Sequence, residues 1–248
     1  MADVVHLNWQ SPAIAVIAME DRAGRNTFTL ELVSGLKRAF DAVVAAPEAK
    51  VVVLHGYESI FCAGGTEEEL LGIADRKQKF DEAGFYRMLL DVPLPVISAM
   101  QGHALGGGLV FGLYADLVVM AEQALYATNF MKYGFTPGMG ATDIVPRKLG
   151  EALGAEMLFT AASYHGGKLR ERGIGIPVVP RSEVVPKALA LAGDLADKPL
   201  VALKMLKETL TAPVRENLPK VVEREMHMHE VTFAQPGIRE RIRARFGQ

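Results

Sequence analysis

The stretch QGHALGGGLV, residues 101–110, contains three consecutive glycines, Gly106 to Gly108, between two strongly apolar segments. The preceding run PVISAM (95–100) predicts a buried strand, and the following LVFGLYADLVV (109–119) is too apolar to face water. Glycine loses more conformational freedom on folding than any other residue. Three glycines at one turn therefore indicate that the backbone approaches another group closely at this point.

A second stretch, FCAGGTEEEL (61–70), has the same organisation, because a small-residue turn separates the apolar run VVVLHG (51–56) from a predicted helix. A helix N-terminus leaves backbone N–H groups without partners and presents the positive end of the helix dipole. Two such turns side by side could direct two N–H donors at one oxygen, as in an oxyanion hole. The alternative is that the glycines only permit tight packing of helix on sheet, and glycine content alone leaves both interpretations open.

Outward from these turns, strand-like and helix-like segments alternate. Strands are predicted at 4–10, 14–20, 50–56, 93–102 and 116–121, and helices at 27–48 with Thr29 as N-cap, in part of 66–91, and at 106–115. This order predicts an α/β fold with parallel strand pairing. After about residue 145 the pattern becomes helical, at 147–164, 182–210, 217–233 and 237–246. We expect a core over residues 1–195 and a helical C-terminal region over 196–248, as one continuous unit.

Composition excludes several classes of protein. The chain has 248 residues, 50% hydrophobic, with a net charge of −2, which implies no general attraction to nucleic acid or to anionic membranes. Its one cysteine, Cys62, excludes an intrachain disulfide, and we interpret it as a packing residue. No signal peptide and no membrane-spanning apolar run is visible, so we expect a cytoplasmic protein. The basic end RERIRARF (239–246) fits either a solvated helix face or an acidic, phosphate-bearing partner.

Common cofactor and metal motifs are also missing from the sequence. There is no Walker-type phosphate loop, no GxGxxG, HExxH, GxSxG or CxxC, and the six histidines form no obvious ligand cluster. We therefore expect no metal and no cofactor.

The segments FCAGG (61–65), QGHALGGG (101–108) and ADLVVMAEQALYATNFMKYGFTPGMGAT (115–142) resemble the crotonase (enoyl-CoA hydratase/isomerase) superfamily, and the similarity extends over nearly the whole chain. The resemblance implies a spiral of ββα units with a helical C-terminal trimerisation region. It also implies that the N–H groups of Gly65 and Gly107 hold a thioester carbonyl as it becomes an enolate. We expect a homotrimer or a dimer of trimers, with Leu203, Leu206 and Leu210 partly covered by neighbouring subunits.

Hydratases of this superfamily carry two catalytic glutamates, and the matching positions here are Val110 and Phe130. Adding water requires general acid and base groups, which an apolar pair cannot supply. The resemblance therefore implies a substrate pocket, with Val110 and Phe130 in it, that stabilises an enolate without hydrating an alkene. His103, inside the second glycine turn, is a candidate for the same pocket, and a packing role is the alternative. Decarboxylation of a β- or vinylogous carboxylate fits, since the electrons left by departing CO2 flow into the thioester.

A closer resemblance narrows the reaction. The segments GGTEEELL, KF and YRMLLD (64–71, 79–80 and 86–91), together with NFMKYGFTPGMGAT (129–142) and MHEVTF (228–233), are similar to the decarboxylating members found in polyketide β-branching cassettes. Those enzymes convert a 3-methylglutaconyl group on an acyl carrier protein to a 3-methylcrotonyl-type group. The resemblance implies a catalytic pair, Lys79 and His229. Some of those enzymes also have a tyrosine one helical turn before the lysine. The corresponding stretch here, GIADRKQKF, contains no tyrosine, so that role is not carried over to this chain.

The helical pattern supports one member of this pair. His229 shares an apolar face with Val222, Met226 and Phe233, whereas His227 falls among charged residues. Lys79 lies in a charged run, so that only the resemblance singles it out. Two alternatives stay open at this point: an enoyl thioester isomerase or hydratase with atypical catalytic groups, and a non-catalytic crotonase-fold binding or scaffold protein. The choice between a carrier-protein and a CoA thioester is also open.

Overall fold

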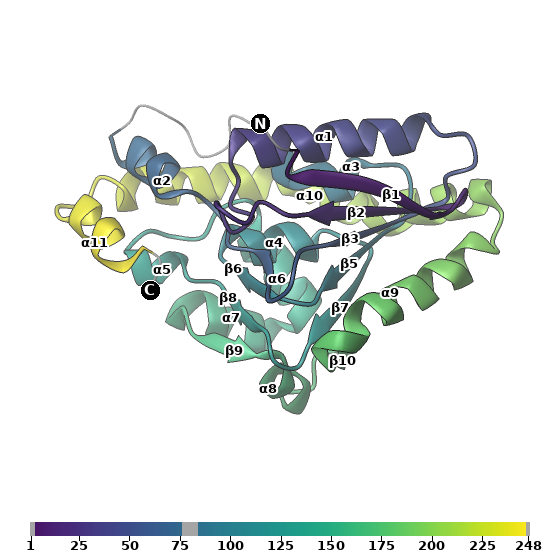
Figure 1. Ribbon diagram of the computed structural model, residues 1–248. Helices are drawn as coiled ribbons and strands as arrows, with labels where there is room; N and C mark the ends of the chain where they lie inside the picture. Colours follow the sequence, from purple (N-terminus) through teal and green to yellow (C-terminus); the bar gives the residue numbers. More distant parts are fainter. Residues whose placement is uncertain (1–2, 76–83, 247–248) are drawn as a thin grey trace.

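A computed structural model describes residues 3–75 and 84–246 (Figure 1). The chain begins with the hairpin β1 (Val5–Ser11) and β2 (Ile14–Met19), followed by α1 (Leu30–Ala45). The Thr29 hydroxyl accepts a hydrogen bond from Leu32 N–H, so the predicted N-cap is confirmed. Helix α1 packs on β1 and β2 through the buried face of Leu32, Leu36 and Phe40.

Three successive units of strand, strand and helix follow. They are β3 (Val51–His55), β4 (Ile60–Cys62) and α2 (Glu67–Ala74); β5 (Val96–Met100), β6 (His103–Leu105) and α4 (Gly107–Leu113); and β7 (Leu117–Ala121), β8 (Leu125–Ala127) and α5 (Phe130–Tyr133). The short helices η1 (Phe85–Arg87) and α3 (Met88–Asp91) precede β5. The predicted spiral of ββα units is confirmed.

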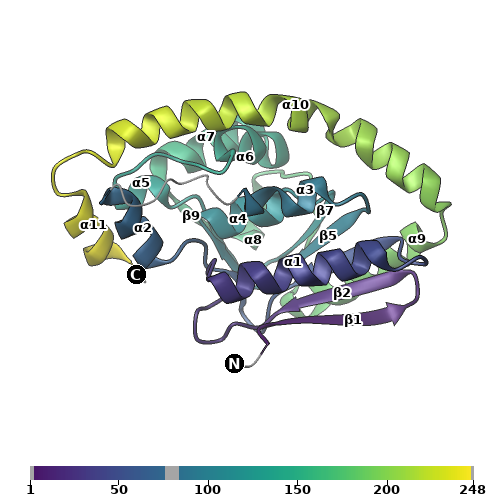
Figure 2. The ribbon, with the colours of Figure 1, turned by 90° about the horizontal axis from the view of Figure 1, so that it is seen from above.

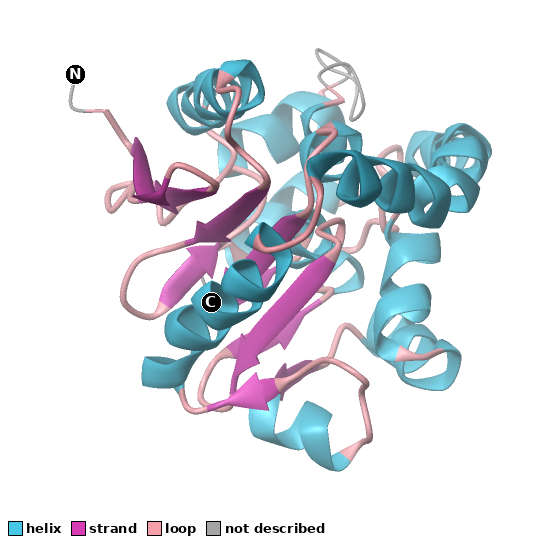
Figure 3. Ribbon diagram, turned by 90° about the vertical axis from the view of Figure 1, so that its right-hand side faces the viewer, coloured by secondary structure: helices cyan, strands magenta, loops and turns pink. Residues whose placement is uncertain are grey.

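The first strand of each unit joins one sheet and the second strand joins another. One sheet has the order β1-β2-β3-β5-β7-β10, with β10 at Val178–Val179, and the other has the order β4-β6-β8-β9, with β9 at Ser163–His165. From β2 to β10 the first sheet is parallel, as predicted. The strands form a twisted central layer surrounded by helices (Figure 3). The prediction missed β4, β6 and β8, because three residues are too few to show an alternating pattern.

The C-terminal half is helical, but its helix boundaries differ from the prediction. The predicted helix 147–164 is divided between α6 (Ala141–Leu149) and α7 (Glu151–Thr160), because Gly150 has a φ of +95°. Its predicted end was wrong, because Ser163 and Tyr164 belong to β9. After α8 (Gly166–Glu171), α9 (Arg181–Ala196) covers β3, β5 and β7. The predicted helix 182–210 was wrong, because α9 ends at Ala196 and α10 begins after Pro199.

Helix α10 (Leu200–Thr232) joins two segments that were predicted as separate helices, and α11 (Ile238–Arg245) follows it. Figure 2 shows α10 as a long curved helix along one edge of the molecule, between α9 and α11. It contains Pro213 and Pro219, residues that bend helices without necessarily ending them. The expected boundary between residues 195 and 196 falls at the end of α9, and the division into core and C-terminal region stays a prediction.

Buried contacts tie α10 to the core. The Lys207 ammonium lies 2.9 Å from Asp116 and donates to the carbonyl oxygens of Leu89 and Leu94, both at 2.9 Å. Leu203 is buried inside the chain, with 6% of its surface exposed, so its expected place at a subunit interface was wrong. Leu206 and Leu210 are 56% and 68% exposed. None of the described helices is long and apolar enough to span a membrane.

Candidate active site

The two glycine turns lie directly against each other. A Cβ on Gly64 would lie 2.6 Å from the Leu105 carbonyl oxygen and 3.3 Å from the Gly107 nitrogen. A Cβ on Gly108 would lie 2.2 Å from the carbonyl oxygen of Cys62. Gly64 also has a φ of +89°, a conformation that favours glycine. The glycines at these positions therefore serve close contact of backbone with backbone, and this contact aligns the ends of β4 and β6.

The two predicted donors lie at the starts of the helices that follow these strands. Gly107 is the first residue of α4, and Gly65 lies just before Thr66, the N-cap of α2. Within residues 3–75 and 84–246, neither the Gly65 nor the Gly107 N–H donates a backbone hydrogen bond to another described residue. A Cβ on Gly65 would meet only the ends of two side chains, at 3.8 and 3.9 Å, so steric demand does not explain this glycine.

Val110 and Phe130, the positions that the resemblance matches to the hydratase glutamates, are apolar and buried. Val110 is completely buried in α4, and Phe130 is buried at the start of α5. The Phe130 ring packs edge-on against Phe135, with 6.2 Å between ring centroids. Neither side chain can exchange a proton with water or substrate.

His229 lies on the buried face of α10, next to the same aromatic cluster. Its ring contacts Phe135 and Phe233, with centroids 6.3 and 5.4 Å away, and its Nε2 lies 2.8 Å from the carbonyl oxygen of Thr136. Burial lowers the pKa of the imidazole, an effect that the backbone carbonyls of Thr136 and Pro137 partly oppose. Since a carbonyl only accepts, Nε2 carries the hydrogen in the neutral ring. The predicted apolar face is confirmed.

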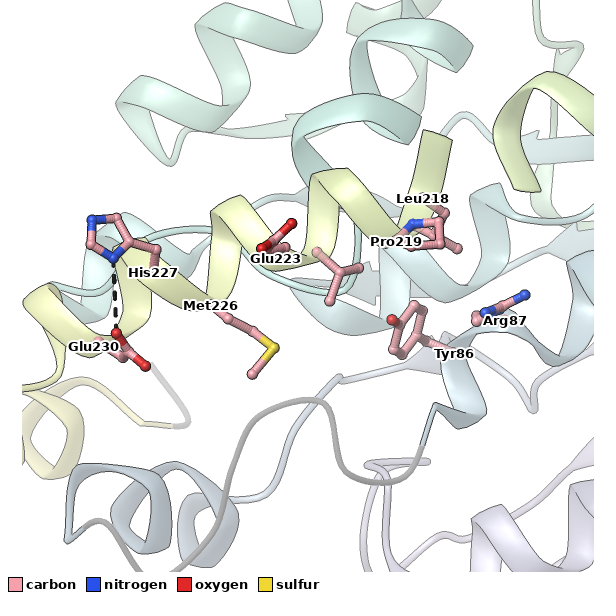
Figure 4. Close-up of a pocket in the computed structure, with 9 residues that line it drawn as sticks. Tyr86, Arg87, Leu218, Pro219, Glu223, Met226, His227 and Glu230 are labelled. Carbon is pink, nitrogen blue, oxygen red and sulfur yellow. Dashed lines mark ion pairs between the residues drawn. The ribbon is translucent and has the colours of Figure 1, made fainter. Parts of the chain in front are cut away.

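His227, in contrast to the buried His229, is exposed to solvent over 80% of its side chain, and its Nδ1 lies 3.8 Å from the Glu230 carboxylate. It lines a cleft of about 500 Å³ between η1 and α10, together with Tyr86, Arg87 and Met226 (Figure 4). The cleft reaches the helical turn before His229 but includes neither glycine turn.

Of the remaining predicted residues, Lys79 lies outside the described part of the chain. His103 begins β6 and its Nδ1 accepts a hydrogen bond from Leu125 N–H at 2.9 Å, which links β6 to β8. Burial lowers the pKa of His103. Cys62 is buried, its thiol donates to the Asn26 carbonyl, and burial raises its pKa to about 12. A thiol with so high a pKa stays protonated, so the interpretation of Cys62 as a packing residue is confirmed.

Sequence analysis missed Glu225, which is buried on the same face of α10 as His229. Its carboxylate accepts hydrogen bonds from the N–H groups of Gly140 and Thr142 at 2.7 and 2.8 Å and from the Thr142 hydroxyl at 2.6 Å. The signal was present in the sequence, since Glu225 lies three residues after Val222 and four before His229. An acidic residue on a buried helix face requires hydrogen-bond partners elsewhere in the fold.

No three histidine, cysteine, aspartate or glutamate side chains among the described residues are grouped as they would be around a metal ion.

Comparison with known proteins defines the class. The enoyl-CoA hydratase/isomerase family model matches residues 10–246, so the chain belongs to this family. The resemblance to the crotonase superfamily is thereby confirmed. It is 47% identical over 244 residues to the bacillaene synthase decarboxylase PksI of Bacillus subtilis, with 98% of each chain covered.

Two solved structures agree with this placement. A structure from a dehydratase/decarboxylase enzyme couple involved in polyketide β-branching matches with a TM-score of 0.97 and 46% identity, over 99% of this chain and all of the other. The ECH2 decarboxylase domain of CurF from Lyngbya majuscula matches with a TM-score of 0.95 and 40% identity, over the same shares. The protein is accordingly a decarboxylase of the crotonase superfamily.

Proposed function

We propose that this decarboxylase acts on a 3-methylglutaconyl-type thioester carried by an acyl carrier protein and forms a 3-methylcrotonyl-type product in polyketide β-branching. The observation that supports the proposal best is the combination of two aligned glycine turns with the buried, apolar Val110 and Phe130. An enzyme built in this way can stabilise an enolate but has no carboxylates at the positions where hydratases have them. The names of the relatives point to the same chemistry.

In the proposed reaction the bond between the carboxylate carbon and the acyl chain breaks and CO2 departs. The electron pair moves through the conjugated chain onto the thioester oxygen, and the N–H groups of Gly65 and Gly107 stabilise the negative oxygen of this dienolate. A proton then adds to carbon and restores the thioester carbonyl. The apolar surroundings raise the energy of the localised carboxylate relative to the dispersed charge of the transition state.

We assign Lys79 and His229 to the departure of CO2 and to the protonation that follows it. The Lys79 cation orients the departing carboxylate so that the breaking bond lies perpendicular to the thioester plane. His229 hydrogen-bonds the carboxylate or supplies the quenching proton. Because Nε2–H of His229 faces the Thr136 carbonyl, a proton from Nδ1 requires the imidazolium form, which an arriving substrate carboxylate would stabilise.

The thioester carrier and the assembly are parts of the same proposal. The carrier protein and CoA present the same pantetheine arm, and β-branching favours the carrier protein. The exposed Leu206 and Leu210 on α10 support a homotrimer or a dimer of trimers, as the superfamily implies. The cytoplasmic location stays a prediction.

Incubation with 3-methylglutaconyl groups attached to a carrier protein and to CoA tests the proposal, with intact-mass spectrometry of each product. We expect loss of CO2 from the acyl group, faster on the carrier protein. Gain or loss of water would identify a hydratase instead. An unchanged mass would favour one of the two alternatives, an isomerase or a non-catalytic scaffold protein. NMR of the recovered acyl group distinguishes them, because only an isomerase moves the double bond.

A further inference from the structure

Glu225 and His229 lie one helical turn apart on α10 and bind the two ends of one loop, Thr136 to Gly140. His229 Nε2 meets the Thr136 carbonyl at 2.8 Å, and the Glu225 carboxylate accepts from the Gly140 N–H at 2.7 Å. Because residues at i and i+4 occupy the same helix face, α10 holds the loop at a fixed span.

Met139, near the end of this loop, contacts the other proposed reacting group, Gly107. A Cβ on Gly107 would lie 2.8 Å from Met139 Sδ, so the Met139 side chain packs directly on the first residue of α4. The Met139 carbonyl accepts a hydrogen bond from the Tyr114 hydroxyl at 2.7 Å. The loop therefore joins His229, at its beginning, to Gly107, near its end.

Holding this loop has an energetic cost that its partners must offset. Met139 has a φ of +64°, a left-handed conformation that is unfavourable for a residue with a side chain, and such strain persists only where surrounding contacts enforce it. Glu225 accepts three hydrogen bonds at the N-terminus of α6, where the helix dipole favours a negative charge. Charge-assisted bonds of this kind are stronger than neutral ones.

From these contacts we propose that Glu225 is a positioning residue for decarboxylation, which acts through the loop 136–140 to fix the distance between His229 and the Gly107 N–H. This inference rests on the proposed function of His229 and Gly107. The Glu225 carboxylate acts without touching the substrate. It sets the geometry of the two groups that do.

The test uses Glu225→Gln, with Glu216→Gln, an exposed position on α10, as matched control. A glutamine side chain has one accepting oxygen, and its amide group can only donate, so one of the N–H groups of Gly140 and Thr142 loses its acceptor. Misplacement of a catalytic group by about 1 Å can cost about 10²-fold in rate. We expect Glu225→Gln to lower kcat by about tenfold or more with KM within about twofold, and Glu216→Gln to change neither.

NMR of the 15N-labelled His229 ring supplies a measurement that does not depend on turnover. We expect the Nε2–H resonance to shift or broaden in Glu225→Gln and to stay unchanged in Glu216→Gln. The proposal stands only if kcat and this resonance both change in a folded protein, and any other pattern overturns it. If Glu225→Gln does not fold, the same two measurements on Thr142→Val, which removes only the 2.6 Å hydroxyl contact, decide in its place.

The two levels of proposal fail separately. A wild-type protein that leaves the methylglutaconyl thioester intact would end the proposed function and this inference with it, whereas an active wild type with an unchanged kcat or an unchanged His229 resonance in Glu225→Gln would overturn the inference alone.

Discussion

The imidazole Nε2 of His229 lies 2.8 Å from the carbonyl oxygen of Thr136, in a hydrogen bond between the long C-terminal helix α10 and the loop after α5. The two residues are 93 positions apart in the chain. The contact orients the ring and assigns its hydrogen to Nε2 in the neutral form. It also places the histidine among Phe135 and Phe233 rather than in solvent.

Replacing His229 tests its catalytic role, and replacing His227 serves as the control. We expect His229→Ala to lower single-turnover decarboxylation by about 10²-fold or more, the range for loss of a general acid or base. His227→Ala should have little effect, because that side chain is 80% exposed and faces Glu230. Loss of activity in His227→Ala with retention in His229→Ala would show that the helix face had been assigned wrongly.

Lys79 and Lys77 form a second matched pair, although both lie outside the described residues. We expect Lys79→Ala to lower the rate of CO2 release by about 10²-fold or more, because the departing carboxylate loses the cation that orients it. Lys77→Ala should keep normal turnover. The opposite outcome would mean that the assignment within this charged run is displaced by two positions.

At Gly107, two substitutions distinguish the effect of losing the N–H donor from the effect of adding a side chain. Gly107→Pro removes the donor, and proline is well tolerated at the first position of a helix. Gly107→Ala keeps the donor but brings a Cβ against Met139 and Phe28, as the proline ring does. We expect the proline variant to be at least about 10²-fold slower than the alanine variant, with circular dichroism to confirm folding of both. Equal rates would remove Gly107 from the oxyanion hole.

Burial of His229 predicts how stability depends on pH. Its pKa in the folded protein is lowered, so the unfolded chain binds a proton more readily. The stabilising contribution is present above the unfolded value of about 6.5 and is lost as the pH falls through the lowered folded-state pKa. Urea unfolding at fixed protein concentration should give a lower free energy of unfolding at about pH 5 than at about pH 7.5.

His103, whose pKa is also lowered, contributes in the same direction. The decrease should therefore be smaller in His229→Gln than in the wild-type protein. Identical pH dependence in wild type and His229→Gln would contradict the lowered pKa.

The exposed leucines of α10 predict the assembly. We expect sedimentation of the wild-type protein to show a trimer or a dimer of trimers at micromolar concentration. A charge at Leu210, which is 68% exposed, should dissociate it, because Leu210→Glu would place an unpaired carboxylate in a buried contact. A wild-type monomer at this concentration would refute the prediction.

The sequence determined features that depend on spacing within one element. Thr29 was recognisable as a helix cap, and His229 and His227 were separable by helical period. Local spacing fixes which face of a helix or strand a side chain occupies, and a chain shows that spacing without its fold.

The tertiary structure alone decided which residues meet across the chain. The three-residue strands β4, β6 and β8 are too short to have a period of their own, and they are held by pairing with one another in a second sheet. Helix α10 continues through residues 211–216, Pro213 among them, where the sequence predicted a gap between two helices, and its buried Lys207 and Glu225 bind distant loops. Buried polar groups must find partners, but the chain itself does not specify which, because hydrogen bonds between elements form only where packing brings them together.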